Sequence, residues 1–170
     1  MRPIELYRPE LEVSKADFVR VHTRPFLIYS QNPSRESTPV DARLMTIDRF
    51  VVDGNRPSPF RETIVATELV ARDPDEKKIV TIGAAPTSDI VINDNSLSKQ
   101  HAWFARSNEA YEAWQLWDND SVGGTQVNAQ LLKPGFPQAL QSGDVITLGY
   151  VEMTFLTADA FYSLVKHLLR

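Results

Sequence analysis

The sequence comprises 170 residues, of which 42% are hydrophobic, a size typical of one domain with a buried core. It contains no cysteine, which excludes disulfides, thiolate metal sites and a cysteine nucleophile, and its net charge of −4 argues against a duplex nucleic-acid partner. No apolar run approaches the roughly 18 residues of a membrane span, and no secretory signal is present at the N-terminus. We therefore expect a cytoplasmic protein without a membrane partner.

The first 62 residues form a proline-rich extension. Ser14 begins a weak capping box that predicts one or two helical turns. Residues 25–29 and 44–53 are rich in apolar and aromatic residues and predict strands, with a polar loop at 32–41 between them. A further strand is predicted at 63–71. Because these strands would have unpaired edges on their own, we expect the extension to pack on the remainder of the chain.

Short strands are predicted throughout residues 63–157. Runs rich in Val, Ile, Thr, Trp and Phe alternate with turn sequences such as Gly-Gly and Ser-Gly-Asp, and no helical period fits them. The spacing leaves no room for the helices of a parallel βαβ fold, so the pattern predicts an all-β, antiparallel β-sandwich. The predicted strands cover residues 79–82, 90–92, 101–106, 113–118, 125–128, 145–148 and 151–156.

The last segment, residues 158–170, changes period and predicts a short C-terminal amphipathic helix. Thr157 can serve as its N-cap, with Asp159 in the first turn. The apolar residues follow the spacing of one helix face: Phe161, Leu164, Val165, Leu168 and Leu169. We expect this face to cover the sandwich core; contact with a partner or a second copy is the alternative.

The sequence shows no arrangement of catalytic, metal-ligating or nucleotide-binding residues typical of an enzyme. His22, His101 and His167 are far apart and none has a zinc-ligand spacing. The phosphate-binding loops GxxxxGK[ST] and GxGxxG are absent, and Asp118-Asn119-Asp120 lacks the remainder of a calcium loop. We therefore expect a non-enzymatic protein with no metal and no cofactor.

Five sequence blocks stand out in the predicted sandwich. They are residues 81–83 (TIG), 88–92 (SDIVI), 96–102 (SLSKQHA), 121–128 (SVGGTQVN) and 143–149 (GDVITLG). In this order and spacing, residues 65–157 strongly resemble the forkhead-associated (FHA) domain, in particular a bacterial member. The resemblance implies a β-sandwich whose loops at one end bind phosphothreonine peptides, and hence a protein or phosphoprotein partner.

The resemblance also implies roles for individual residues. Ser98 matches the serine whose hydroxyl binds the phosphate in family members, and Lys99 stands where some members place a basic phosphate ligand. His101 matches a histidine that braces the recognition loops. Gly83 is expected to allow a close backbone approach at a strand end. Thr125, in the fourth block, is a further candidate for the phosphopeptide site.

Two positions depart from the family pattern. Ala84 stands where the family has arginine, and Gly123 stands where it has the asparagine that holds the peptide backbone. A charge-assisted hydrogen bond contributes about 1.5–3 kcal/mol, so loss of the arginine alone predicts binding weaker by about ten- to a hundredfold. Asp94, Asp118 and Asp120 add negative charge nearby. On this alignment, Ala84→Arg with Gly123→Asn should raise phosphopeptide affinity.

We therefore predict a protein-interaction module with weakened or lost phosphothreonine recognition. One alternative is a functional reader in Ser/Thr kinase signalling that uses a substitute cation, either Arg106 or an arginine of the extension. The other is a structural or self-associating unit, a possible homo-oligomer, which Trp103, Trp114 and Trp117 would serve as anchors. We expect at least one of these rings to lie outside the sandwich core, covered by the extension or by the C-terminal helix.

Overall fold

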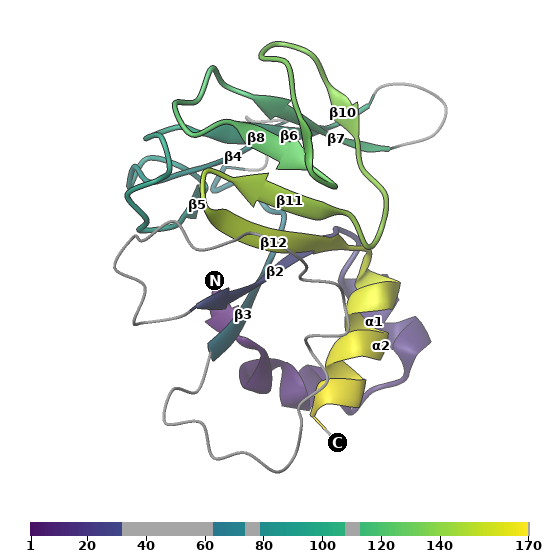
Figure 1. Cartoon of the computed structure of the whole chain (residues 1–170). Coiled ribbons are helices and arrows are strands. Elements are labelled where there is room, and N and C mark those ends of the chain that lie inside the picture. The colour runs from purple at the N-terminus through teal and green to yellow at the C-terminus, as the bar shows by residue number, and fades with distance from the viewer. Residues whose placement is uncertain (32–62, 74–78, 108–112, 170) are drawn as a thin grey trace.

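The computed structural model describes residues 1–31, 63–73, 79–107 and 113–169, which form a sandwich of two β-sheets with helical segments on one side (Figure 1). One sheet contains β1 (Arg2–Pro3), β2 (Phe26–Gln31), β3 (Thr63–Glu68), β8 (Thr125–Val127), β9 (Gln130–Leu131), β11 (Val145–Leu148) and β12 (Val151–Leu156). The other contains β4 (Ile79–Gly83), β5 (Ile90–Val91), β6 (Ala102–Arg106), β7 (Trp114–Asp118) and β10 (Gln138–Ala139). The predicted all-β sandwich is thus confirmed.

The two sheets have nearly continuous antiparallel pairing. The seven-stranded sheet has the order β1-β3-β2-β12-β11-β8-β9, and the five-stranded sheet has the order β10-β7-β6-β4-β5. The pair of β4 with β5 is parallel, whereas the other pairs are antiparallel. Strand β2 lies inside the seven-stranded sheet, between β3 and β12: residues 26–31 pair with β3, and residues 26–28 pair with β12 as well.

Three helical segments accompany the sheets: the 3-10 helix η1 (Ile4–Leu11), α1 (Lys15–Val21) and α2 (Ala158–Leu168). The Ser14 side chain accepts a hydrogen bond from the Asp17 amide at 3.2 Å, which caps α1. The Thr157 side chain caps α2 in the same way, through the Ala160 amide at 3.4 Å. Both predicted helix starts are confirmed, whereas η1 was not predicted from the sequence. The described residues include no helix that could span a membrane.

The seven-stranded sheet has apolar residues on both faces. Leu27 and Phe155 point into the sandwich, where they pack with Phe104 and Leu116 of the other sheet. The neighbouring residues along β2 and β12 point to the opposite face, because successive side chains of a strand alternate. This second face carries residues such as Phe26 and therefore needs a cover of its own.

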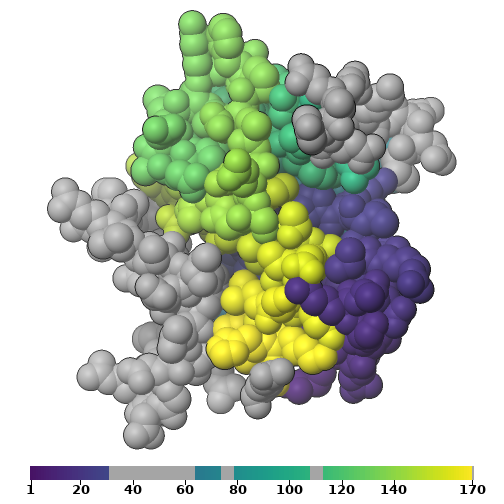
Figure 2. All heavy atoms as spheres, turned by 90° about the vertical axis from the view of Figure 1, so that its right-hand side faces the viewer, coloured from purple at the N-terminus to yellow at the C-terminus, as the bar shows by residue number. Residues whose placement is uncertain are grey.

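The helical segments supply that cover, which we call the aromatic cap: η1, α1 and α2 on the outer face of β2, β3 and β12. Phe26 and Phe161 stack with ring centroids 3.9 Å apart, and Tyr7 meets Phe161 edge-on at 5.0 Å. The Tyr162 hydroxyl donates to the Val13 carbonyl at 2.8 Å. Figure 2 shows the C-terminal helix in yellow against N-terminal residues in purple. The amphipathic stripe of α2 thus covers the sandwich, as expected.

One pair of tryptophans lies outside this arrangement. Trp103 and Trp117 are cross-strand partners on β6 and β7, and their rings stack with centroids 4.1 Å apart. Their neighbours Phe104 and Leu116 are fully buried, so the pair lies on the outer face of the five-stranded sheet. The described helical segments pack on the other sheet, so the expected cover is not found in the described part of the chain. Trp114 instead packs against the sandwich core.

Some predictions fall on residues outside the described ranges. These are the polar loop at 32–41 and the strand at 44–53. The division of the chain into residues 1–62, 63–157 and 158–170 stays a prediction, although β2 of the first part and β3 of the second share one sheet.

Candidate functional site

Four loops meet at one end of the sandwich, which we call the loop end. The Ala84 amide donates to the Ser98 carbonyl at 3.0 Å, and the Gly149 amide donates to the Gly124 carbonyl at 3.0 Å. These bonds join segments that are far apart in the sequence but contain most of the candidate residues. The loop end comprises residues 83–89, 94–101, 118–124 and 149–150.

Gly83 and Ser88 hold the first two loops together. A Cβ at Gly83 would overlap the carbonyl of Lys99 and would lie 2.9 Å from the His101 amide nitrogen, so only glycine fits here. The buried Ser88 hydroxyl donates to the same Lys99 carbonyl at 3.1 Å. The backbone before His101 is therefore fixed, while the Lys99 side chain remains exposed.

His101 connects two loops from a fully buried position. Its Nδ1 accepts a hydrogen bond from the Ser98 amide at 3.0 Å, which requires that Nδ1 carry no proton. Nε2 then carries the proton and donates to the Gly124 carbonyl at 3.0 Å. A neutral imidazole with this one tautomer therefore sets the distance between the Ser98 loop and the Gly124 loop.

Asp118 organises the turn that follows β7. Its carboxylate accepts hydrogen bonds from the Ser121 amide at 3.0 Å and from the hydroxyls of Ser121 and Thr125 at 2.6 Å each. Burial raises the pKa of Asp118, but these hydrogen bonds outweigh burial and hold its pKa below the ordinary value. The charge is directed at three donors inside the protein, so it does not face a ligand as the sequence led us to expect.

Thr125 is likewise placed away from the surface. It is fully buried, and its hydroxyl is directed to Asp118. The structure therefore gives this candidate residue a supporting position beneath the loop end, out of reach of a bound peptide.

Ser98 presents one donor at the loop end. Its Oγ accepts a hydrogen bond from the Val122 amide at 3.0 Å. A hydroxyl has one proton and two acceptor lone pairs, so the proton of Ser98 is left to donate elsewhere. Together with the adjacent ammonium of Lys99, this surface offers one hydroxyl donor and one point charge to an anion.

The two departures from the family pattern have a structural consequence. Ala84 is half-buried and packs against the sandwich core, where it contributes no charge. A Cβ at Gly123 would lie 2.7 Å from the Ser96 carbonyl oxygen and 2.9 Å from Gly149 Cα. A side chain at position 123 would therefore require a backbone shift, and the Gly123→Asn half of the double variant that the sequence suggested is sterically opposed.

Sequence reasoning missed three residues of the loop end. The Ser96 hydroxyl donates to the Asp94 carboxylate at 2.6 Å and accepts from the Tyr150 amide at 3.0 Å. The sequence Asp94-Asn95-Ser96 is typical of an Asx turn, and this pattern could have identified Ser96. Val122 and Tyr150 are 98% and 67% exposed, so the surface around Ser98 carries two apolar side chains. The exposure of Val122 and Tyr150 could be predicted only from their positions next to the turn glycines Gly123 and Gly149.

The structure also shows where two arginines lie, and so whether each could substitute for the one absent at position 84. Arg106 ends β6 at the far end of the sandwich and donates to the Thr23 carbonyl at 3.4 Å, so it cannot replace the missing arginine at position 84. Arg72 is exposed and donates to the Pro86 carbonyl at 2.6 Å, beside the first loop. No sequence pattern singles out Arg72, because a contact between distant segments fixes its place.

Comparisons with known proteins agree with this geometry. Residues 80–149 match the family model of the FHA domain. The oxoglutarate dehydrogenase inhibitor of Corynebacterium efficiens is 36% identical over 85 residues, which are 50% of this chain and 56% of the relative. The glycogen accumulation regulator GarA of Mycobacterium tuberculosis is 32% identical over 82 residues, 48% of this chain and 47% of the relative.

The chain thus spans about half the length of the curated relatives it matches. Among solved structures, the FHA domain of an Arabidopsis thaliana hypothetical protein superposes with a TM-score of 0.51 and 19% identity, and the match covers 79% of this chain and 86% of that chain. This likeness supports the sandwich fold.

Proposed function

Since this chain carries an FHA domain, a protein-interaction module, we propose that its loop end binds a protein partner with little or no dependence on phosphothreonine. The observation that carries the proposal is the pair Ala84 and Gly123. Ala84 supplies no cation, and Gly123 is closed off by Ser96 and Gly149. A phosphate would therefore meet Ser98 and Lys99 without the bidentate donor that phosphates favour.

The rest of the surface supports contact with an ordinary peptide. Val122 and Tyr150 are exposed apolar side chains beside the Ser98 loop, and exposed aromatic residues are common anchors of interfaces. The backbone beneath them is fixed by His101 and Asp118, so little order need be gained when a partner binds. The curated relatives, named as an inhibitor and as a regulator, support a regulatory role in a bacterial cell.

A second candidate function is phosphothreonine reading with Arg72 as the substitute cation. Its guanidinium lies against the Pro86 carbonyl in the loop that begins at Gly83. A guanidinium has five N–H donors, so one bond to Pro86 leaves others for a phosphate. This candidate requires the Arg72 side chain to act across the first loop toward Ser98.

The deciding experiment compares threonine-centred peptide libraries with and without phosphate, measured by fluorescence anisotropy. We expect the unchanged chain to bind both libraries alike. The Ala84→Arg variant should bind the phosphorylated library about ten- to a hundredfold more tightly than the parent, because it restores a charge-assisted bond. Ala84→Gln, of similar length but uncharged, should show no such gain, and Ser98→Ala added to Ala84→Arg should remove it.

Micromolar binding of the unchanged chain that disappears on dephosphorylation would overturn the proposal. It would support the second candidate if Arg72→Gln then abolished that binding. If a folded Ala84→Arg variant gains nothing, position 84 does not face the phosphate and the alignment of the site is wrong.

A further inference from the structure

The outer face of the five-stranded sheet carries a group of apolar side chains, whereas the described helical segments pack on the other sheet. Trp103 and Trp117 lie near its centre, as directly facing residues of β6 and β7. Residues that pair across neighbouring strands point to the same side of a sheet, so Thr81 of β4 lies beside Trp103 on this face. We call the surface the tryptophan face and define it by Ile79, Thr81, Val91, Trp103, Gln115 and Trp117.

The tryptophan face is apolar and partly exposed. Ile79 is 37% exposed and Val91 is 39% exposed, and the side chains of Trp103 and Trp117 are half-buried. The two rings stack at an interplanar angle of 7°, so each ring covers one face of the other and this stack accounts for part of their burial. A connected group of exposed aromatic and aliphatic side chains is typical of a surface that binds another protein.

None of the outward side chains of these strands carries a charge. Beside the residues that define the face, the other outward side chains are those of Ala105 on β6 and Ala139 on β10. Asp89 precedes β5 at the border, but its carboxylate accepts from the Thr81 amide at 2.8 Å, the Thr81 hydroxyl at 2.6 Å and the Arg72 amide at 2.9 Å. A charged partner segment would bury its charge here without a counter-charge, which is unfavourable. The partner surface must therefore be uncharged as well.

The centre of the face has the symmetry that contact with a second copy of this chain needs. In a two-fold dimer the same surface lies on both sides, and a contact from residue i to residue j is repeated from j to i. Trp103 of one copy then contacts Trp117 of the second copy, and the repeated contact is chemically the same. Facing residues of an antiparallel pair are related by a local two-fold axis, and here the two residues are identical.

The polar groups of the face are also complementary to themselves. Within the described part of the chain, the indole N–H groups of Trp103 and Trp117 have no hydrogen-bond partner, and neither has the side chain of Gln115. An indole N–H only donates, whereas an amide both donates and accepts. The Gln115 amide of one copy can therefore accept a hydrogen bond from an indole N–H of the second copy.

The net charge of the chain favours the same surface. At a net charge of −4, two copies repel each other at long range. On the tryptophan face no like charges meet, so two copies can approach there without direct repulsion. We propose that the tryptophan face is a homodimer interface, in which the Trp103–Trp117 stack of one copy packs on that of the second copy. The proposal does not depend on what the loop end binds.

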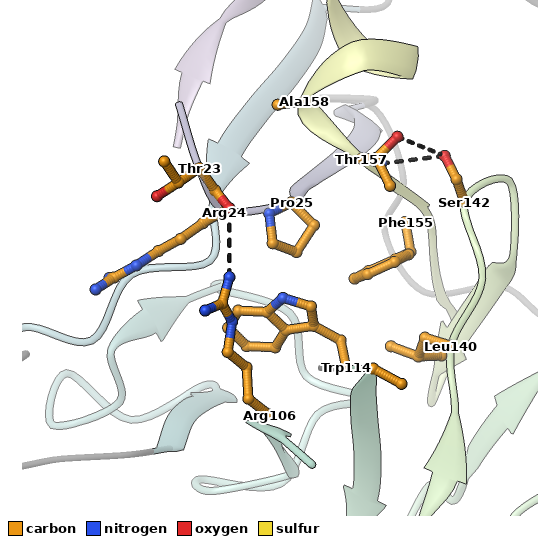
Figure 3. Close-up of a pocket in the computed structure, with 11 residues that line it drawn as sticks. Thr23, Arg24, Pro25, Arg106, Trp114, Leu140, Ser142, Phe155, Thr157 and Ala158 are labelled. Atoms are coloured by element: carbon orange, nitrogen blue, oxygen red, sulfur yellow. Dashed lines mark hydrogen bonds between the residues drawn. The ribbon is translucent and has the colours of Figure 1, made fainter. Parts of the chain in front are cut away.

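Trp114 provides an internal reference for the test. It belongs to β7, as Trp117 does, but it packs against the sandwich core. Figure 3 shows its ring lining a pocket beside the Arg106 guanidinium, whose Cζ lies 5.7 Å from the ring centroid. A contact through the tryptophan face should therefore leave the Trp114 indole resonance in place.

The test uses the full chain labelled with ¹⁵N, without any peptide. Sedimentation velocity from micromolar to millimolar concentration should show a reversible change from monomer to dimer. Over the same range, the indole N–H resonances of Trp103 and Trp117 should shift with concentration, whereas that of Trp114 should not. Each resonance is assigned from its loss in Trp103→Phe, Trp114→Phe or Trp117→Phe.

Variants test the uncharged character of the interface. Gln115→Lys and Gln115→Glu should each weaken dimerisation at least tenfold, because a charge of either sign would be buried without a partner. Gln130→Lys and Gln130→Glu, at an exposed position of β9 in the other sheet, are matched controls and should dimerise like the parent. The concentration series of the parent needs no variant, so it tests the proposal even if a Gln115 variant fails to fold.

Three results would contradict a homodimer through this face. The first is a chain that stays monomeric at millimolar concentration. The second is a dimer whose formation shifts the Trp114 indole, or the amides of Val122 and Tyr150, in place of the indoles of Trp103 and Trp117. The third is weakening by only one of the two Gln115 variants, because a charged group of the second copy would then face this position. Since no peptide is present, none of these results bears on the function proposed for the loop end.

Discussion

At the loop end buried polar groups hold the backbone, whereas at the aromatic cap apolar rings hold whole segments. His101 and Asp118 each bond to several partners at fixed angles, so they position individual carbonyls and amides. Phe26 and Phe161 exclude water over a broad area, but their packing is not directional and does not fix the position of any individual polar atom. The loop end can therefore lack a surface group such as an arginine at position 84 while its frame persists.

The aromatic cap should contribute more to stability than any single residue of the loop end. Phe161→Ala should lower the free energy of unfolding by about 3–5 kcal/mol, because it removes a fully buried ring and leaves a cavity. Chemical denaturation measures the loss. Val21→Ala, at a position that is 76% exposed on α1, should cost little and serves as the control. A loss below about 1 kcal/mol for Phe161→Ala would mean that the cap contributes little to the stability of the sandwich.

The next effect concerns the loop end. His101→Ala should lower the free energy of unfolding by about 2–4 kcal/mol, because it leaves the Ser98 amide and the Gly124 carbonyl without partners. Thermal unfolding, read beside the exposed His167→Ala as control, measures this loss. Amide resonances at residues 96–98 and 122–124 should move far more than those of α2. Uniform changes across both regions would contradict a local role for His101.

The smallest effect depends on pH. Asp118→Asn should destabilise the chain by about 1–3 kcal/mol at pH 7, because the amide accepts fewer hydrogen bonds than the carboxylate. The pKa of Asp118 is lowered in the folded state, so its contribution is present above the unfolded pKa of about 4 and is lost as the pH falls through the folded pKa.

Urea denaturation of parent and variant should therefore converge as the pH falls below about 4. The exposed Asp120→Asn is the matched control and should follow the parent at every pH. A difference between the parent and Asp118→Asn that stays constant from pH 7 to pH 3 would show that the carboxylate charge is not what holds Ser121 and Thr125.

The sequence predicted those features that depend on neighbouring residues. Alternation in residues such as Val80, Ile82 and Phe104 predicted the longer strands, and Ser14 and Thr157 marked the starts of both α-helices. Strands of two residues, such as β9 and β10, are too short to carry a pattern, and they were missed.

Features that depend on distant contacts could not be read in this way. The closure around Gly123 needs Ser96 and Gly149, which come from two other loops. At least one tryptophan ring was expected outside the core and beneath a cover, whereas Trp103 and Trp117 stack on the sheet that the described helical segments do not cover. The sequence does not reveal which sheet these segments choose. Arg72 reaches Pro86 through a contact that no local pattern encodes.

The aromatic cap also imposes an order on folding. The bond from Tyr162 to the Val13 carbonyl closes 149 residues, and that from Arg8 to the Leu169 carbonyl closes 161. Contacts of such separation form late, because a long segment must lose its freedom before they can be made. Until α2 has been synthesised, Phe26 and Tyr7 have no Phe161 to pack on, and the outer face of β2 lacks the part of its cover that α2 supplies. A ribosome stalled before residue 158 would therefore display part of an apolar sheet face, which is a site for chaperone binding or for aggregation.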